Sequence, residues 1–458
     1  MKDTSLVTGE KTRAFVLGPY LAAGKRLKSD RTRRVIHERS PEARIAEARG
    51  LAEAIDVRVV EAKIAALAQI RPASFLGQGK VDEIAALVRD QNIALVIMDC
   101  ALSPVQQRNL EKAFAAKVID RTGLILEIFG RRARTREGAL QVELAHLTYQ
   151  KSRLVRSWTH LERQRGGFGF LGGPGETQIE TDRRLIQERI TRIERDLQSV
   201  KKMRGLHRKK RRAVPYPIVA LVGYTNAGKS TLFNRLTKAE VIAEDMLFAT
   251  LDPTLRALVL PRGGEIILSD TVGFISDLPT MLVAAFKATL EEVTEADLIL
   301  HVRDIAHPDS EAQREDVDRV LAELGIDARR PGRVLEIWNK IDLVDAEKML
   351  ALHNAARRQP ATARAIAISA LTGQGIDELV VRLEARLAAD HVVLNLHVES
   401  NDGRGRNWLY EHTEVLSRSE LADGSLDLSV SAAPALVGKL REKFAPATPA
   451  AARRQPRR

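Results

Sequence analysis

The segment GYTNAGKS occupies residues 223–230 and decides the fold of the central part of the chain. The apolar run Pro217 to Val222 precedes it, and the helix-favouring segment TLFNRLT follows it. A strand, a glycine loop and a helix in this order are the context of a P-loop, in which backbone N–H groups surround phosphate. We therefore predict a P-loop nucleotide-binding domain over residues 213–390, built on a mostly parallel sheet with helices on both faces.

Each fixed position of this loop has a chemical reason. Gly223 and Gly228 permit turns that aim backbone N–H groups inward, Lys229 supplies charge to the outer phosphates, and Ser230 offers a hydroxyl to Mg²⁺. Because this pattern arises by chance in roughly one or two per hundred chains of this length, it needs support from other segments. The remaining loop residues expected to line the nucleotide are Tyr224, Thr225, Asn226 and Ala227.

A second segment follows the strand-like run Ile266 to Ser269 and reads Asp270-Thr271-Val272-Gly273. The carboxylate of Asp270 can hold Mg²⁺ through a water molecule, and the Gly273 amide can meet the γ-phosphate. An adenine-specific P-loop enzyme could share these features. This segment therefore predicts a nucleoside triphosphate site without naming the base.

Two further segments name the base. After Val334 to Trp338 comes Asn339-Lys340-Ile341-Asp342, where the Asp342 carboxylate can accept two hydrogen bonds from N1 and N2 of guanine. Adenine lacks that donor pair, and the buried groups left unpaired would give a discrimination on the order of 10⁴. After Ala365 to Ile368, the backbone of Ser369-Ala370-Leu371 can donate to guanine O6. The predicted substrate is GTP.

Residues 1–130 alternate strand-like and helical runs, which predicts a small α/β domain with parallel strands. The strand-like runs are Arg13 to Leu17, Val57 to Val60 and Ile93 to Met98. Ser103 and Gln106 fit a capping box around Pro104, with a helix to about Ala115. The segment Gly77 to Lys80 is read as a loop before a helix rather than as a second phosphate loop, and the single Cys100 as a packing residue that excludes an intrachain disulfide.

Residues 131–212 change to a heptad period. Apolar residues from Leu140 to Leu161 step by four and three, and Ile186 to Val200 repeat the pattern. Seven glycine and proline residues between 166 and 175 interrupt it, so two facing helices should form an antiparallel hairpin with an exposed tip. A first helix of about 22 residues would place this tip roughly 33 Å away from the helix start.

This hairpin carries the charge of the chain. It holds 22 Lys and Arg against 9 Asp and Glu, a net charge of +13, whereas the whole chain carries +12. The phosphate of RNA or DNA is the expected partner of this charge, and a solvated pair of helices is the alternative. The basic run from Lys201 to Arg212 at the end of the second helix could equally complement the negative end of its own helix dipole. At the tip, basic, aromatic and glycine residues predict contact with bases and phosphates, against a merely flexible turn. These candidate RNA-binding residues are Arg163, Arg165, Gly166, Phe168 and Phe170.

The remaining features set the class of the protein. No apolar run approaches the ~18 residues that span a bilayer, and the amino terminus lacks the layout of a secretory signal, so we expect a cytoplasmic protein. We also expect this protein to be a monomer. Residues 391–445 predict a small α/β domain, and the Ala/Pro/Arg-rich segment 446–458 a disordered basic tail. Together these readings predict an α/β multidomain protein.

At this point the chain resembles the HflX family of translation-associated P-loop GTPases. The family-specific segments are GPGETQIETDRR at 173–184 and FATLDPT at 248–254. The resemblance implies GTP hydrolysis coupled to binding of the large ribosomal subunit, in dissociating stalled or stress-damaged ribosomes or in ribosome assembly. It also implies that Thr250 reaches Mg²⁺ and the γ-phosphate, with Thr254 as the other candidate. The segment expected to line the nucleotide comprises Phe248, Ala249, Thr250, Leu251 and Asp252.

The predicted catalytic residues are Lys229, Thr250 and Gly273, and Ser230 and Thr250 are the predicted Mg²⁺ ligands. Phe274 stands where many GTPases carry a glutamine that orients the attacking water, so slow intrinsic turnover is expected. Asn226 resembles the asparagine of potassium-stimulated relatives, which makes K⁺ dependence a hypothesis. Two alternative functions are an RNA-remodelling protein with ATP-linked helicase activity and a GTPase of RNA modification, which would need a separate chemical site.

Overall fold

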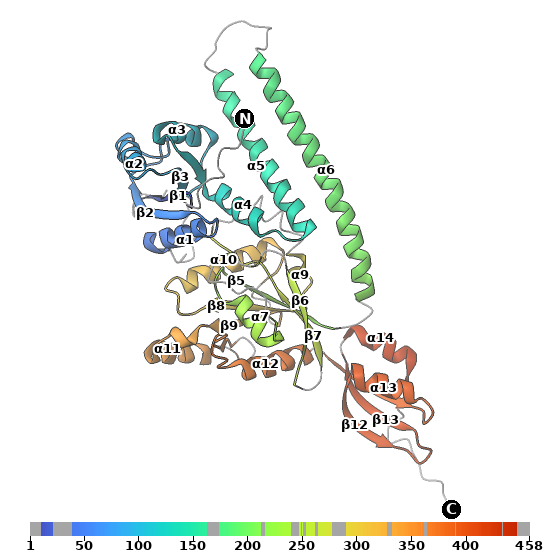
Figure 1. Cartoon of the computed structure of the whole chain (residues 1–458). Coiled ribbons are helices and arrows are strands. Elements are labelled where there is room, and N and C mark those ends of the chain that lie inside the picture. The colour runs from blue at the N-terminus through green and yellow to red at the C-terminus, as the bar shows by residue number, and fades with distance from the viewer. Residues whose placement is uncertain are drawn as a thin grey trace, which may run out of the picture.

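A computed structural model describes residues 11–21, 39–162, 174–211, 216–239, 247–248, 250, 253–261, 264–276, 290–327, 332–358, 360, 364–389, 391–432 and 434–446. Within these ranges the strands form one six-stranded and two four-stranded sheets. The amino-terminal sheet and a long pair of helices lie on one side of the six-stranded sheet, and the carboxy-terminal sheet lies at the far end of the molecule (Figure 1). Among the described helices, none combines the length and the hydropathy of a membrane span.

The amino-terminal sheet has the strand order β2-β1-β3-β4, and every pairing in it is parallel. The prediction of a parallel α/β layer is therefore confirmed, although the short fourth strand was not predicted. Alternate side chains of each strand enter two cores, one beneath α1 and α4 and the other beneath α2 and α3. The elements are β1 (Arg13–Leu21), α1 (Pro41–Glu53), β2 (Arg58–Leu67), α2 (Gln78–Asp90), β3 (Leu95–Met98), α3 (Pro104–Phe114), β4 (Lys117–Asp120) and α4 (Arg121–Arg132).

Two predicted helix starts in this domain are confirmed. The Ser103 hydroxyl accepts a hydrogen bond from the Gln106 N–H at 3.2 Å, and the Gln106 side chain accepts one from the Ser103 N–H at 2.8 Å. This capping box satisfies two N–H groups that the first turn of α3 leaves without helical partners. Gly77 is the residue before α2, so the segment around it is a loop that leads into a helix.

The hairpin consists of α5 (Arg136–Glu162) and α6 (Pro174–Arg211), 27 and 38 residues long, which run antiparallel (Figure 1). The predicted length of about 22 residues for the first helix was too short. The predicted interruption was also too long, because α6 already begins at Pro174, where the missing N–H of proline has no helical partner to lose.

The packing of α5 differs from the predicted heptad seam. Leu140 and Leu144 are only half-buried, whereas Val142 and Ala145 are almost fully buried in the amino-terminal core. The physical reason is that α5 packs on two sides, against α4 as well as against α6. A seam read from one partner helix therefore missed the more deeply buried face.

The six-stranded sheet has the order β10-β9-β8-β5-β7-β6, and only the edge strand β6 is antiparallel. An α/β P-loop domain was predicted, and this strand arrangement agrees with it. Its strands are β5 (Ile218–Gly223), β6 (Thr254–Val259), β7 (Glu265–Asp270), β8 (Leu298–Asp304), β9 (Val334–Asn339) and β10 (Ile366–Ala367). Its helices are α7 (Lys229–Thr237), α9 (Glu291–Thr294), α10 (Ser310–Glu323), the 3-10 turn η1 (Ile341–Leu343), α11 (Ala346–Arg357) and α12 (Ile376–Ala388).

The carboxy-terminal sheet is antiparallel, with the order β12-β13-β11-β14. Sequence reading missed α13 and β12, and it was wrong to assign Pro446 to a disordered tail, because Pro446 pairs with Leu396 in the sheet. Residues 447–458 lie outside the described ranges. The elements are β11 (Val392–Val398), α13 (Gly403–His412), β12 (Glu414–Glu420), β13 (Leu426–Ala432), α14 (Pro434–Lys443) and β14 (Ala445–Pro446).

Candidate nucleotide site

The loop between β5 and α7 has a backbone that only glycine fits at two positions. Gly223 has a φ of +153°, and a Cβ atom there would lie 2.1 Å from the Val302 carbonyl oxygen of the neighbouring strand. Gly228 has a φ of +90°, and a Cβ atom would lie 2.2 Å from the Asn339 side-chain nitrogen. Side chains at either position would push the loop off the sheet, so these glycines fix the loop directly before α7.

Lys229 is the first residue of α7, and its ammonium group turns back into the loop. Its Nζ donates to the Tyr224 carbonyl at 2.8 Å and lies 3.3 Å from the Gly223 carbonyl. The side chain is buried, and this burial lowers the pKa of Lys229 to about 8, although the nearby Asp270 carboxylate acts in the opposite direction. The charge is thus held inside the loop, at the place where a P-loop receives phosphate.

Three oxygen-bearing side chains from separate segments meet beside Lys229. The Ser230 hydroxyl donates to Asp270 Oδ2 at 2.7 Å, and the Thr250 hydroxyl donates to the same atom at 3.1 Å. The two hydroxyl oxygens lie 3.0 Å apart. The other candidate, Thr254, begins β6 and pairs with Asp270 through the strand register.

This oxygen cluster fits Mg²⁺ by its chemistry. Asp270 is buried, and its Oδ1 atom has no hydrogen-bond partner among the described residues. Burial raises the pKa of Asp270, while the bond from Ser230 and the charge of Lys229 partly oppose that rise. A hard cation that prefers oxygen ligands and keeps several waters would satisfy the unpartnered carboxylate oxygen. The described residues contain no group of three or more His, Cys, Asp or Glu side chains that could hold a metal ion.

The segment after β7 lies against the loop. The Thr225 N–H donates to the Phe274 carbonyl at 2.8 Å, and the Phe274 N–H donates to the Gly223 carbonyl at 3.0 Å. A Cβ atom on Gly273 would lie 2.9 Å from Thr225 Cα and 3.0 Å from Lys229 Nζ, so the close approach requires glycine. The Phe274 ring is 1% exposed and belongs to the hydrophobic core.

The two predicted base-binding segments are tied to each other and to the loop by Asn339. Its side-chain nitrogen donates to the Ala227 carbonyl at 2.8 Å, and its side-chain oxygen accepts from the Ala370 N–H at 2.9 Å. Lys340 has a φ of +65° and forms an ion pair with Asp304 at 2.9 Å. The remaining residues of the two segments are Ile341, which is buried, Ser369, which is buried, and Asp342 and Leu371, which are exposed.

The side chains of several residues predicted to line the nucleotide contact other parts of the protein. Phe248 is buried and packs edge-on against Phe129 of α4, with ring centroids 4.8 Å apart. The Thr271 hydroxyl donates to the Leu221 carbonyl at 2.5 Å, so it fastens β7 to β5, and Val272 is 7% exposed within the core. A motif fixes the backbone path, whereas side-chain direction depends on the neighbouring domain, so any contact of these residues with the nucleotide would come from their backbone. Asn226 is exposed with a φ of +59°.

Other predicted residues lie outside the described ranges. These are Ala249, Leu251 and Asp252 of the predicted switch segment, together with Arg163, Arg165, Gly166, Phe168 and Phe170 of the hairpin tip.

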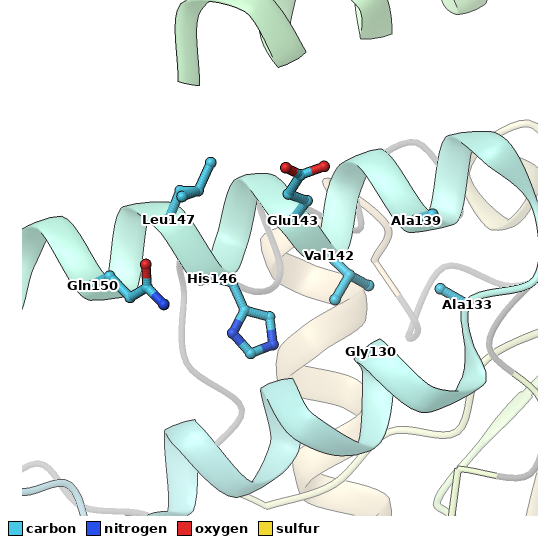
Figure 2. A pocket seen from close by; sticks show the side chains of 8 residues that line it. All are labelled: Gly130, Ala133, Ala139, Val142, Glu143, His146, Leu147 and Gln150. Carbon is cyan, nitrogen blue, oxygen red and sulfur yellow. The ribbon is translucent and has the colours of Figure 1, made fainter. Parts of the chain in front are cut away.

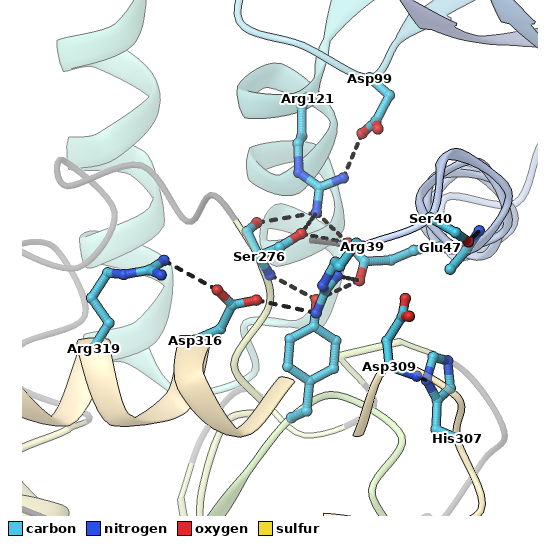
Figure 3. Close-up of polar contacts among 12 residues, drawn as sticks. Arg39, Ser40, Glu47, Asp99, Arg121, Ser276, His307, Asp309, Asp316 and Arg319 are labelled. Carbon is cyan, nitrogen blue, oxygen red and sulfur yellow. Dashed lines mark hydrogen bonds and ion pairs between the residues drawn. The ribbon is translucent and has the colours of Figure 1, made fainter. Parts of the chain in front are cut away.

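Sequence reasoning missed a polar network that joins the amino-terminal domain to this site (Figure 3). Arg121, the first residue of α4, donates to Asp99, to Glu47 and, at 3.1 Å, to the Ser276 carbonyl. The Ser276 hydroxyl donates to Glu47 at 2.9 Å. The Tyr224 hydroxyl donates to Glu47 and accepts from the Ser276 N–H at 2.7 Å. The side chain of Tyr224, predicted to line the nucleotide, therefore faces the amino-terminal domain.

The charges of this network are paired. Burial alone would raise the pKa of Glu47, but Arg121 and Arg39 outweigh it and hold that pKa below its usual range. Burial and the adjacent Glu47 raise the pKa of the Tyr224 phenol. Arg39 also pairs with Asp316 of α10 at 3.1 Å, which adds a second link between the domains. No local sequence pattern announces this network, because Glu47 and Tyr224 are 177 residues apart.

Arg235 of α7 was also missed. Its Nε donates to the Ala370 carbonyl at 2.6 Å, and its guanidinium also bonds the Leu371 carbonyl. Gly373 has a φ of +94°, and a Cβ atom there would lie 2.8 Å from the same guanidinium. The loop that carries the predicted O6 donors is thus fixed from the helix that begins at the phosphate site.

A cavity of about 390 Å³ lies between α4 and α5, apart from the residues of the candidate nucleotide site (Figure 2). His146 lines this cavity, and its Nε2 atom lies 3.1 Å from the Leu126 carbonyl oxygen, so this ring nitrogen already has a hydrogen-bond partner. None of the predicted nucleotide residues lines it.

Four family models match the chain in sequence order. Their descriptions are GTP-binding GTPase N-terminal for residues 42–130, GTP-binding GTPase Middle Region for 132–211, 50S ribosome-binding GTPase for 218–340 and HflX C-terminal domain for 354–449.

Curated relatives match most of the chain. GTPase HflX of Magnetococcus marinus is 52% identical over 372 residues, 81% of this chain and 83% of that protein. GTPase HflX of Escherichia coli is 49% identical over 360 residues, 78% of this chain and 82% of that protein. A solved structure of a GTP-binding protein from Sulfolobus solfataricus in complex with GDP is 22% identical, covers 82% of this chain and 98% of its own, and has a TM-score of 0.44.

Proposed function

This chain belongs to the HflX family of GTPases and hydrolyses GTP, and from that premise we propose that it acts on the large ribosomal subunit, dissociating stalled or stress-damaged ribosomes or assisting ribosome assembly. The observation that carries the proposal is the basic hairpin, which holds a net charge of +13 and extends from the amino-terminal domain as two long antiparallel helices (Figure 1). This basic hairpin, called the arm below, concentrates positive charge on one long projection, as expected for a protein that binds the phosphates of a large RNA.

Within the site, the residues take distinct roles in the proposal. Lys229 and the loop N–H groups hold the outer phosphates, and the Gly273 N–H contacts the γ-phosphate. Asp342 reads N1 and N2 of guanine. Ser230 and Thr250 are the hydroxyl ligands for Mg²⁺, which supplies positive charge to the β- and γ-phosphates when bound.

The same contacts offer a route from the γ-phosphate to the arm. Ser276 follows Gly273 by three residues and is bonded to Arg121 at the start of α4. Asp120, the residue before Arg121, is in turn bonded by Tyr149 of α5 at 2.6 Å and by Arg153 of α5 at 2.5 Å. A shift of Gly273 toward the γ-phosphate therefore moves a segment that is bonded to the base of the arm. We propose that GTP binding presents the arm to ribosomal RNA in this way, and that hydrolysis permits release.

Co-sedimentation with isolated large ribosomal subunits tests the proposal. The protein is pelleted near physiological salt with a non-hydrolysable GTP analogue, with GDP or with ATP. Binding that requires the GTP analogue supports a GTP-gated ribosome factor. Equal binding in all three states, or no binding, contradicts it, and binding that requires ATP supports the RNA-remodelling alternative.

A pair of charge variants tests the arm. Arg163→Ala with Arg165→Ala should weaken pelleting and leave intrinsic GTP hydrolysis unchanged, because these residues lie at the predicted tip. The matched control removes the same charge from α13 by Arg404→Ala with Arg406→Ala, both exposed. Equal weakening by both pairs would indicate that only the total charge matters.

A further inference from the structure

Thr225 is the one residue of the P-loop whose polar side chain is buried and still has no assigned partner. It is 6% exposed, and its Oγ1 atom has no hydrogen-bond partner among the described residues. A buried hydroxyl without a partner destabilises a fold, because it has lost its bonds to water and gained none. An unsatisfied group of this kind in a substrate site calls for a bond that the substrate supplies.

The position of Thr225 makes the γ-phosphate region the place for that bond. A Cβ atom on Gly273 would lie 2.9 Å from Thr225 Cγ2 and 3.0 Å from Lys229 Nζ, so these three residues converge on one point. The Thr225 N–H also donates to the carbonyl of Phe274. The methyl group of Thr225 lies against Gly273, and a rotation of about 120° about its Cα–Cβ bond exchanges the methyl for the hydroxyl.

The neighbouring polar groups are already bonded. The Tyr224 hydroxyl is held by Glu47 and Ser276, and the hydroxyls of Ser230 and Thr250 are held by Asp270. Phe274 has no polar atom in its side chain and packs in the core. Of the hydroxyl groups of Tyr224, Thr225, Ser230 and Thr250, that of Thr225 is therefore the one without a hydrogen-bond partner among the described residues, and it can bond the reacting phosphate.

We infer that Thr225 is a catalytic residue of GTP hydrolysis, whose hydroxyl bonds the γ-phosphate and the attacking water where other GTPases use a glutamine. The inference rests on the nucleotide site proposed above. The water oxygen forms a bond to the γ-phosphorus, and the bond to the β–γ bridging oxygen breaks with its electron pair on GDP. The proton of the water passes to a γ-phosphate oxygen. Thr225 accepts a hydrogen bond from the water and donates one to the phosphate, and it is itself unchanged.

The test separates hydrolysis from binding. Thr225→Val keeps the shape of the side chain and removes the hydroxyl, and Thr225→Ser keeps the hydroxyl. Single-turnover GTP hydrolysis and GDP affinity are measured for both, with Thr237→Val at the end of α7 as a control of the same chemistry. Thr225→Val should slow hydrolysis by about 10- to 100-fold with GDP affinity within about twofold, whereas Thr225→Ser and Thr237→Val should remain near the wild-type rate.

Three results overturn the inference. These are a wild-type rate for Thr225→Val, an equal slowing by Thr225→Val and Thr225→Ser, and a fall in GDP affinity as large as the fall in rate. Should Thr225→Val fail to fold, as seen by its melting temperature, the rate of Thr225→Ser relative to Thr225→Ala decides the question, and equal rates overturn the inference. Lys229→Ala is measured in parallel, because wild-type GDP affinity in that variant would contradict the proposed site itself rather than the role of Thr225.

Discussion

The amino-terminal sheet and the six-stranded sheet both place carboxylates at the carboxyl edge of parallel strands, but they leave those carboxylates in different states. Asp120, at the end of β4, accepts hydrogen bonds on both oxygens, from Gly123, Tyr149, Leu102 and Arg153. Asp270, at the end of β7, has a bonded Oδ2 and an unpartnered Oδ1. The carboxyl edge of such a sheet is the usual place for a ligand, and the bonding of its side chains decides whether one fits.

This difference in hydrogen bonding indicates different roles for the two edges. The amino-terminal edge has used its polar groups to hold α4, α5 and, through Arg121, the Ser276 segment of the GTPase domain. The nucleotide edge keeps a buried ammonium on Lys229, a half-bonded Asp270 and an unbonded Thr225 hydroxyl. One edge is therefore a joint between domains, and the other holds the polar groups of the proposed nucleotide site.

The largest effect is expected where the nucleotide edge reads the base. Asp342→Asn replaces a carboxylate that can accept from both N1 and N2 of guanine with an amide that offers one acceptor and adds a donor. GTP affinity should fall on the order of 10³-fold, or about 4 kcal/mol, because a buried donor of guanine loses its partner. Xanthosine triphosphate, which carries an oxygen at position 2, should gain affinity. Competition of both nucleotides against a fluorescent GDP measures this, and unchanged selectivity for guanine would remove Asp342 from the site.

A smaller effect is expected at the joint. Glu47→Gln keeps the size of the side chain and removes the negative charge that pairs with Arg121 and Arg39. The side chains of all three residues are about one tenth exposed. The free energy of unfolding should fall by about 2 kcal/mol, because two buried guanidinium groups lose their shared counter-charge. Urea unfolding of the whole chain measures the change.

The matched control for the joint is Glu42→Gln, an exposed residue on the same helix. It should stay within about 0.5 kcal/mol of wild type, because exposed charges contribute little. An equal effect of both substitutions would mean that Glu47 contributes only to α1, and that the contact between the two edges carries no stability of its own.

These two regions also differ in how much of their structure could be predicted from the sequence. The P-loop fold and the guanine-type segments follow from short patterns such as GYTNAGKS, because their residues are neighbours in the chain. The meeting of Ser230, Thr250 and Asp270 also involves residues that lie in recognisable segments. The joint could not be predicted, since Glu47 contacts residues 177 and 229 positions away and no local pattern encodes such pairs. The deeper burial of Val142 over Leu144 has the same cause, namely a second packing partner for α5.

The smallest effect is expected for Arg235, a residue of α7 that holds one loop of the nucleotide edge by hydrogen bonds. Arg235 bonds the carbonyls of Ala370 and Leu371 from α7, so it fixes the loop whose N–H groups face guanine O6 in the proposed site. Arg235→Ala should raise the dissociation rate of GDP about fivefold, or about 1 kcal/mol, because the loop loses two bonds on its far side while the base keeps its own contacts.

Arg235→Lys refines this last prediction, since lysine keeps the charge but lacks the planar pair of donors that reaches two carbonyls at once. It should resemble Arg235→Ala in a stopped-flow measurement of GDP release, and both should leave single-turnover hydrolysis of saturating GTP unchanged. A lysine variant with wild-type release would mean that charge near the loop suffices. A loss of hydrolysis in either variant would mean that the loop carrying Ala370 and Leu371 is coupled through α7 to the residues around the phosphate. The nucleotide edge would then depend on a connected set of hydrogen bonds, as the joint does.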